Sequence, residues 1–322
     1  MALSKFLDPK NDFAFKKIFG TEKNKGILIH FLNDMLAFSG NQAITEVTFL
    51  SPVQDPDILA KKQSLVDVLC QDKNGVKYII EMQVAKTKGF EKRAQYYAAK
   101  AYSQQADQGD HYHELKEIIF IAIADCLIFP DKPSYKSDHI ILDRDSGEHD
   151  LKDFYFTFIE LPKFKKAPEE LTSMIEKWCY FFKHAEGTHP ADLEKIIGTD
   201  SVIKQAYHEL DRYYWTENEL LIYEQEVKRT RDAQAIIAQK LDDARAEGIK
   251  EGKAEGREEG IKEGIKEGKA EGIKEGREEG IKEGMHKAQM AMAKKLLAHG
   301  VERNTVKLST GLSDEDLNQL QE

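Results

Sequence analysis

The stretch that decides the fold runs LVDVLCQDKNGVKYIIEMQ, residues 65–83. Two apolar runs are separated by Asp-Lys-Asn-Gly, which is typical of a β-hairpin. The first run carries Asp67 and the second carries Glu81. If the turn contains one extra residue, with Gly75 in the left-handed conformation, Asp67 lies opposite Glu81 and Gln83 follows on the same face. The pattern then predicts two carboxylates and a polar third group on one strand pair, which can hold a divalent metal ion.

The alternative is that Asp67 and Glu81 are outward positions of half-exposed strands, because alternation places polar residues on the solvated face. Their neighbours argue against that alternative. Asp67 shares its face with Leu65 and Leu69, and Glu81 shares its face with Ile79. A face that mixes these apolar residues with the two acids is not an ordinary solvent-exposed face.

The hairpin is embedded in an alternation of helical and strand-like segments, which predicts an α/β fold. The expected helices cover residues 9–38 (in two pieces), 88–105, 169–184 and 201–214, and the expected further strands cover 44–50, 117–128, 139–142 and 154–161. The segment 117–128 is almost entirely apolar, which favours a buried strand.

Composition narrows the class of protein. The chain has 322 residues, 32% of them charged, and its three cysteines lie in apolar surroundings, which favours reduced thiols over a disulfide framework. We expect a cytoplasmic protein without a membrane partner, since no leader-like or membrane-length apolar run is found. The net charge is −10, yet residues 1–100 carry 15 Lys and Arg against 11 Asp and Glu. This local excess is consistent with a nucleic-acid partner near the hairpin.

The chain changes character after Tyr214. Residues 247–284 contain ten Glu-Gly-x-x units in unbroken register. Ten glycines would cost a helix about 10 kcal/mol relative to alanine, so one interpretation is a mobile tether. The other is a helix whose glycine ridge lets a second helix approach closely, giving a self-association stalk. We expect an α/β domain at 1–215, a helical extension at 216–300 and a short helical cap at 301–322.

Asp67 with Glu81-Met82-Gln83 resembles the PD-(D/E)xK nuclease signature. Together with NDFAFKKIFG at 11–20 and the RAQYY segment at 93–97, the chain resembles the recombination-promoting nuclease/putative transposase family of bacteria. The resemblance covers roughly residues 8–215 and extends to the Glu-Gly repeat. It implies a restriction-endonuclease-like core, in which helices flank a mixed central sheet, and a metal-dependent DNA endonuclease.

The resemblance also implies roles for individual residues. Mg²⁺, with Mn²⁺ as the alternative, is expected on Asp67, Glu81 and the Met82 carbonyl, with Asp67, Glu81 and Gln83 as the catalytic set. Phosphate contacts are expected from Arg93, Tyr97, Lys16 and Lys86, and Asp12 is a candidate auxiliary acid. Asp12 and Lys16 are four residues apart, so a plain helix ion pair is the alternative for them.

One departure from the family pattern matters most. Gln83 stands where the signature usually has lysine, and a neutral amide cannot supply a positive charge. Either the chemistry depends more on the metal, or a nearby cation such as Lys86 or Arg93 substitutes. The rival function is therefore a catalytically degenerate nuclease-fold protein that binds DNA or supports assembly. RNA cleavage is a third alternative, and a homo-oligomer through the C-terminal helical region is expected.

Overall fold

A computed structural model describes residues 4–54, 64–106, 111–198 and 200–320. The chain divides into two compact units, Met1–Ala233 and Gln234–Glu322. The first unit contains the sheet and its flanking helices, and the second contains the Glu-Gly repeat and the C-terminal helices. Among the described residues, no helix is both long enough and apolar enough to cross a membrane.

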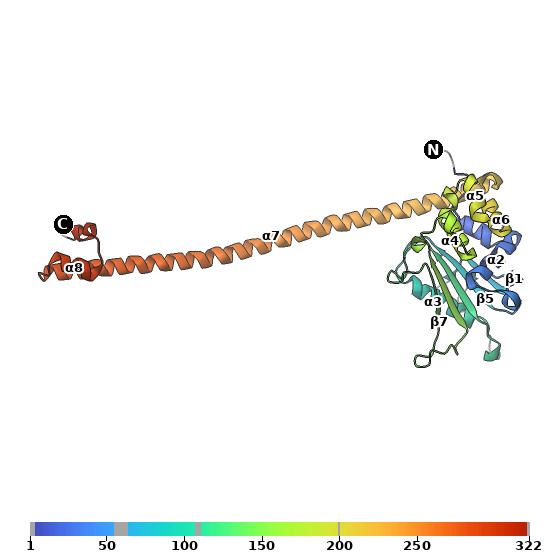
Figure 1. Cartoon of the computed structure of the whole chain (residues 1–322), viewed down its shortest axis with the longest axis horizontal. Coiled ribbons are helices and arrows are strands. Elements are labelled where there is room, and N and C mark those ends of the chain that lie inside the picture. Colours follow the sequence, from blue (N-terminus) through green and yellow to red (C-terminus); the bar gives the residue numbers. More distant parts are fainter. Residues whose placement is uncertain (1–3, 55–63, 107–110, 199, 321–322) are drawn as a thin grey trace. The chain divides into compact units, whose positions relative to one another are not determined.

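The central sheet is mixed, and its strands lie in the order β1-β4-β5-β6-β8-β7. Figure 1 labels β1, β5 and β7. The first three strands are antiparallel, β6 runs parallel to both β5 and β8, and β7 closes the far edge antiparallel to β8. The strands are β1 Val47–Phe49, β4 Val68–Asp72, β5 Lys77–Gln83, β6 Ile118–Ala124, β7 Lys136–Ile140 and β8 Phe154–Glu160, and β2 Val53–Gln54 pairs separately with β3 Ser64–Leu65. Every residue of β6 is buried, as expected for a central parallel strand.

Helices cover both faces of the sheet. The helices of the first unit are α1 Asp12–Phe19, α2 Lys25–Leu36, α3 Phe90–Ser103, α4 Met174–His184, α5 Pro190–Ile197 and α6 Ser201–Leu210. One face packs against α1, α2, α4, α5 and α6 in a core rich in aromatic rings, and the other packs against α3 and the loop after β6 (Figure 1). Alternation along β5 separates the two cores, because Tyr78 and Ile80 enter the first whereas Ile79 enters the α3 core.

The hairpin has the register that requires one extra turn residue. Val68 pairs with Ile80 and Gln71 with Lys77, and continuing this register by one step places Asp67 opposite Glu81. Gly75 has φ +85°, a conformation that glycine adopts without strain. The Asp72 carboxylate accepts hydrogen bonds from the backbone of Asn74 and Val76, which fixes the turn. The predicted bulged register is confirmed.

The α/β fold class is confirmed, as is the restriction-endonuclease-like arrangement of a mixed sheet between helices. Two local predictions were wrong. Asp67 is not a strand residue, because it lies at a bend immediately before β4. The strand expected at 139–142 is shifted, since β7 spans Lys136–Ile140, whereas the strand expected at 154–161 is found as β8. Helix α5 was not expected, although Pro190 at its first position is a regular helix start.

In the C-terminal part, α7 spans Glu217–Ala298, α8 spans Arg303–Thr310 and α9 spans Asp314–Gln319. The whole Glu-Gly repeat is helical, as the stalk interpretation requires, and a Cβ added at any of its ten glycines would meet nothing within 4 Å. The end of α7 packs with α8 and α9 around Ala293, Val306, Leu312 and Leu317. The proposed boundaries at 215 and 300 stay a prediction.

Candidate active site

The side chains of Asp67 and Glu81 each accept a hydrogen bond from a backbone N–H group on the opposite arm of the hairpin. The backbone N–H of Asp67 donates to Glu81 Oε1 over 3.2 Å, and Asp67 Oδ2 accepts from the backbone N–H of Met82 over 2.8 Å. Glu81 is only 6% exposed, and its neighbour on the same face, Gln83, is 8% exposed. The hairpin register therefore places two carboxylates together in a largely buried position beneath α3.

Burial makes this carboxylate pair hard to ionise. It raises the pKa of Glu81 to about 8, with the negative charge of Asp67 as the second cause, while the Arg93 charge acts in the opposite direction. Burial likewise raises the pKa of Asp67, against the hydrogen bond from Met82 and the charge of Lys16. Two buried oxygen ligands that lack sufficient positive charge suit a hard divalent cation. The residues present therefore fit the metal that the fold implies.

Helix α1 contributes a cation to the edge of the pair. Its N-cap is Asn11, whose side chain accepts hydrogen bonds from the backbone N–H groups of Phe13 and Ala14. Lys16 Nζ lies 2.6 Å from Asp12 Oδ1 and 3.6 Å from Asp67 Oδ1. Asp12 thus forms the helix ion pair given above as the alternative to an auxiliary acid. Among the described residues, no group of three or more His, Cys, Asp or Glu side chains is placed to hold a metal ion.

Gln83 and Arg93 form a second pair beside the carboxylates. Arg93 Nη2 donates to Gln83 Oε1, and Gln83 Nε2 donates to the backbone carbonyl of Ala85. The Arg93 guanidinium also lies over the Phe90 ring, 4.9 Å from its centroid. Its Nε is buried and finds no hydrogen-bond acceptor in the described part of the chain. The Gln83 amide therefore orients the guanidinium of Arg93 through one of its five donors.

Of the other predicted phosphate ligands, Tyr97 lies near the pair and Lys86 does not. The Tyr97 ring centroid is 6.0 Å from the Arg93 guanidinium, and the pKa of Tyr97 is raised by burial and then by the charge of Glu81. Lys86 is exposed, and its charge acts on the Cys126 thiol, whose pKa is raised mainly by burial. The structure thus does not bring Lys86 to the carboxylates.

A basic hollow of about 550 Å³ opens at the start of α3. Its lining residues are Thr87, Lys88, Gly89, Phe90, Lys92, Arg93, Tyr96 and Tyr97. The sequence reasoning missed Lys88, Lys92 and Tyr96, although cations interleaved with tyrosines at helical spacing were a usable signal. A concave surface with cations and aromatic rings beside buried carboxylates suits the backbone of a nucleic acid.

The mixed sheet, with an acidic pair on its central hairpin, defines the PD-(D/E)XK class of nuclease folds. A family model described as PD-(D/E)XK nuclease family transposase matches residues 9–240, and the chain belongs to this family. A second model, described as Rpn/YhgA-like nuclease family, C-terminal HTH domain, matches residues 286–322. The resemblance to the recombination-promoting nuclease/putative transposase family is thereby confirmed. No curated protein and no solved structure matches the chain.

The second match gives the C-terminal segment a meaning that the sequence reasoning missed. Residues 301–322 were expected to form a short helical cap, and α8 and α9 lie within the segment that matches the C-terminal HTH model, whose fold is associated with DNA binding. The signals were present in the sequence. Gly311, with φ +70°, ends α8, and Ser313 caps α9 together with Asp316.

Proposed function

We propose that the chain is a metal-dependent DNA endonuclease that hydrolyses phosphodiester bonds in DNA recombination or in processes of mobile elements and phages. One observation carries the proposal: Asp67 and Glu81 are buried together with raised pKa values beside an oriented arginine. A structural ion pair would join opposite charges, whereas this pair joins like charges. We further propose that it acts in the cytoplasm, where buried Cys70 and Cys179 remain thiols.

Asp67, Glu81 and the Met82 carbonyl would hold Mg²⁺, with Mn²⁺ as the alternative. A bound ion of this kind lowers the pKa of its water and polarises the phosphate. Arg93, which lines the basic hollow, would bind the phosphate through its guanidinium, and Tyr97 would contact the same or the adjacent phosphate. Lys16 would hold Asp67 in place and favour its ionised form. Gln83 would act by orienting Arg93, which supplies the positive charge that the usual lysine provides.

The test is incubation of the purified full-length protein with supercoiled plasmid DNA in Mg²⁺, in Mn²⁺ and in EDTA. The endonuclease proposal predicts nicked and linear products with either metal and intact plasmid in EDTA. The degenerate-site alternative predicts intact plasmid in all three conditions, with a retained gel shift. A structured RNA under the same conditions tests the RNA alternative.

The raised pKa of Glu81 predicts a pH-dependent stability. The carboxyl ionises near its ordinary value of 4.5 in the unfolded chain and at about 8 in the folded one. Between these values the folded state keeps a proton that the unfolded state has lost, so the free energy of unfolding falls as pH rises, by about 1.4 kcal/mol per pH unit.

Denaturant unfolding in EDTA from pH 5 to pH 8 measures this effect against Glu81→Gln, which carries no ionisable group at the position. The stability of the variant relative to the wild type should increase with pH. Mg²⁺ should stabilise the wild type most at the highest pH, because the ion requires both carboxylates ionised. A pH-independent difference between the two proteins would contradict the assignment.

We propose that DNA is the partner of the nuclease unit and of the helix-turn-helix domain, and that the Glu-Gly helix mediates self-association. The observation behind the second proposal is the unbroken glycine register on a helix with open space around each position where a glycine lacks a Cβ. A period of four exceeds 3.6 residues per turn, so such a ridge can stay in contact with a partner helix only by right-handed winding.

Replacing the ten repeat glycines with alanine should lower the mass measured by light scattering, because the added methyl groups block close helix approach. Helicity should rise at the same time. Deleting residues 247–322 should also reduce the mass, and a chain lacking only residues 286–322 is the control for the helix-turn-helix domain. Unchanged mass after both the replacement and the longer deletion would favour a simple spacer.

A further inference from the structure

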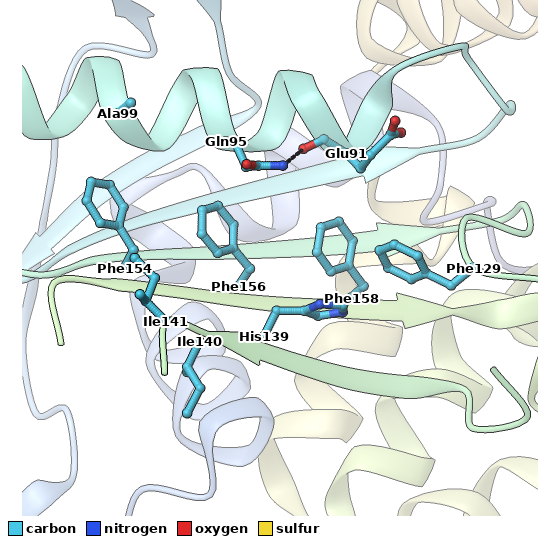
Figure 2. Close-up of a pocket in the computed structure, with 10 residues that line it drawn as sticks. All are labelled: Glu91, Gln95, Ala99, Phe129, His139, Ile140, Ile141, Phe154, Phe156 and Phe158. Atoms are coloured by element: carbon cyan, nitrogen blue, oxygen red, sulfur yellow. Dashed lines mark hydrogen bonds between the residues drawn. The ribbon is translucent and has the colours of Figure 1, made fainter. Parts of the chain in front are cut away.

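A second pocket lies on the α3 face of the sheet, away from the carboxylate pair. Its volume is about 490 Å³, and it is enclosed by α3, β8, β7 and the loop after β6 (Figure 2). The residues that line it are Glu91, Gln95, Ala99, Phe129, His139, Ile140, Ile141, Phe154, Phe156 and Phe158. The proposed nuclease mechanism uses none of these side chains.

The floor of the pocket is a row of aromatic rings. Phe154, Phe156 and Phe158 alternate along β8 and point toward α3 (Figure 2). The Phe154 and Phe156 rings are nearly parallel, at 6° and 6.5 Å between centroids, and Phe129 meets Phe158 at 90° and 5.1 Å. Flat rings of this kind offer stacking faces to any base without selecting among sequences.

The opposite wall is polar. Gln95 is exposed, and its side-chain Nε2 donates a hydrogen bond to the Glu91 backbone carbonyl over 3.1 Å, which holds the amide over the rings, while the Glu91 carboxylate points away from them (Figure 2). At the other end, Lys132 Nζ lies 3.5 Å from His139 Nε2 and 5.1 Å from the Phe129 centroid. The oxygen of the Gln95 amide can accept from the amino and imino groups of base edges, and the lysine provides a cation for a phosphate.

Helix α3 connects this pocket to the proposed active site. Its buried stripe consists of Phe90, Ala94, Ala98 and Ala101. Glu91 and Gln95 lie on one flank of the stripe, whereas Arg93 and Tyr97 lie on the other. A nucleic-acid strand held by Arg93 therefore reaches the pocket by crossing only the first turns of this helix.

We propose that the pocket binds an unpaired nucleobase of a single DNA strand next to the cleavage site. This inference rests on the proposed function and extends it, because it assigns the enzyme a substrate with single-stranded character. Stacking rings, the Gln95 amide and an adjacent cation match the base and phosphate of a nucleotide. An apolar protein side chain would leave Gln95 and Lys132 without a role.

The experiment measures binding of a fluorescent oligothymidylate to the full-length protein in EDTA, where metal-dependent cleavage is absent. Phe156→Leu keeps the apolar volume and removes the stacking face, so we expect about tenfold weaker binding. Gln95→Ala should weaken binding severalfold. Because Gln95 is exposed, this substitution does not disturb the packing of the core. Tyr112→Leu, an exposed ring outside the pocket, is the control and should bind as the wild type does.

Phe156→Trp provides a direct readout, because its fluorescence should be quenched by a stacked base, whereas Trp178 and Trp215 are buried elsewhere. Wild-type affinity in both Phe156→Leu and Gln95→Ala would overturn the proposal, as would equal binding of an abasic strand. The outcome is separable from the nuclease proposal. If the wild type nicks plasmid but the pocket variants bind the oligonucleotide as the wild type does, only the pocket proposal is refuted. If the wild type does not nick plasmid but the pocket variants bind the oligonucleotide more weakly, only the nuclease proposal is refuted.

Discussion

Asp67→Ala and Glu81→Ala should each reduce Mg²⁺-dependent plasmid nicking by about 10³-fold or more, since each removes a proposed ligand of the metal and leaves its partner carboxylate alone. The losses of nicking activity should not add in the double variant, because either substitution alone prevents the metal ion from binding. Metal binding measured by calorimetry should disappear with the activity. Full nicking in either single variant would contradict the assignment.

Glu81→Gln and Asp67→Asn are the matched variants, because they preserve side-chain volume and remove only the charge. Both should be as inactive as the alanine variants while folding at least as well, since each removes a buried carboxyl that resists ionisation. Asp131→Asn, an exposed acid, is the control and should retain wild-type nicking. An active Glu81→Gln protein would show that the carboxylate does not ligate the metal.

The hairpin was predictable because its information is local. A turn of Asp-Lys-Asn-Gly with Gly75 in the left-handed conformation determines the register, and the register alone brings Asp67 opposite Glu81. The buried strand β6 was equally clear from its unbroken apolar run. In each case, neighbouring residues in the sequence decide the structure.

The partner of Gln83 could not be predicted, because it depends on how α3 packs on the sheet. The sequence allowed either Lys86 or Arg93 to supply the missing cation. Phe90, Ala94 and Ala98 bury one stripe of α3 and thereby turn Arg93 toward Gln83, while Lys86 remains exposed. The aromatic pocket depends in the same way on long-range pairing, since β8, β7 and α3 all contribute to it.

Arg93→Ala should reduce nicking by about 10²- to 10³-fold, because it removes the cation proposed to bind the phosphate. Metal binding should remain, since Arg93 is not a ligand. Arg93→Lys should recover only part of the activity. A guanidinium is a rigid planar fork that can donate to Gln83 and hold its other donors in a fixed direction, whereas the donors of an ammonium rotate. Kinetics on plasmid DNA, with calorimetry for the metal, separate these effects. Loss of metal binding in Arg93→Ala would contradict the assigned role.

The role of Gln83 follows from the same contact. Gln83→Glu keeps an acceptor for Arg93 and should remain active, whereas Gln83→Lys places a second cation against the guanidinium and should displace it. In the Arg93→Ala background the result should reverse, because a lysine at 83 then occupies the position that the family signature gives to lysine. We therefore expect Gln83→Lys to restore activity to Arg93→Ala. A double variant no more active than Arg93→Ala would show that Gln83 does not occupy the catalytic lysine position and that Arg93 acts from a place no residue at 83 can reach.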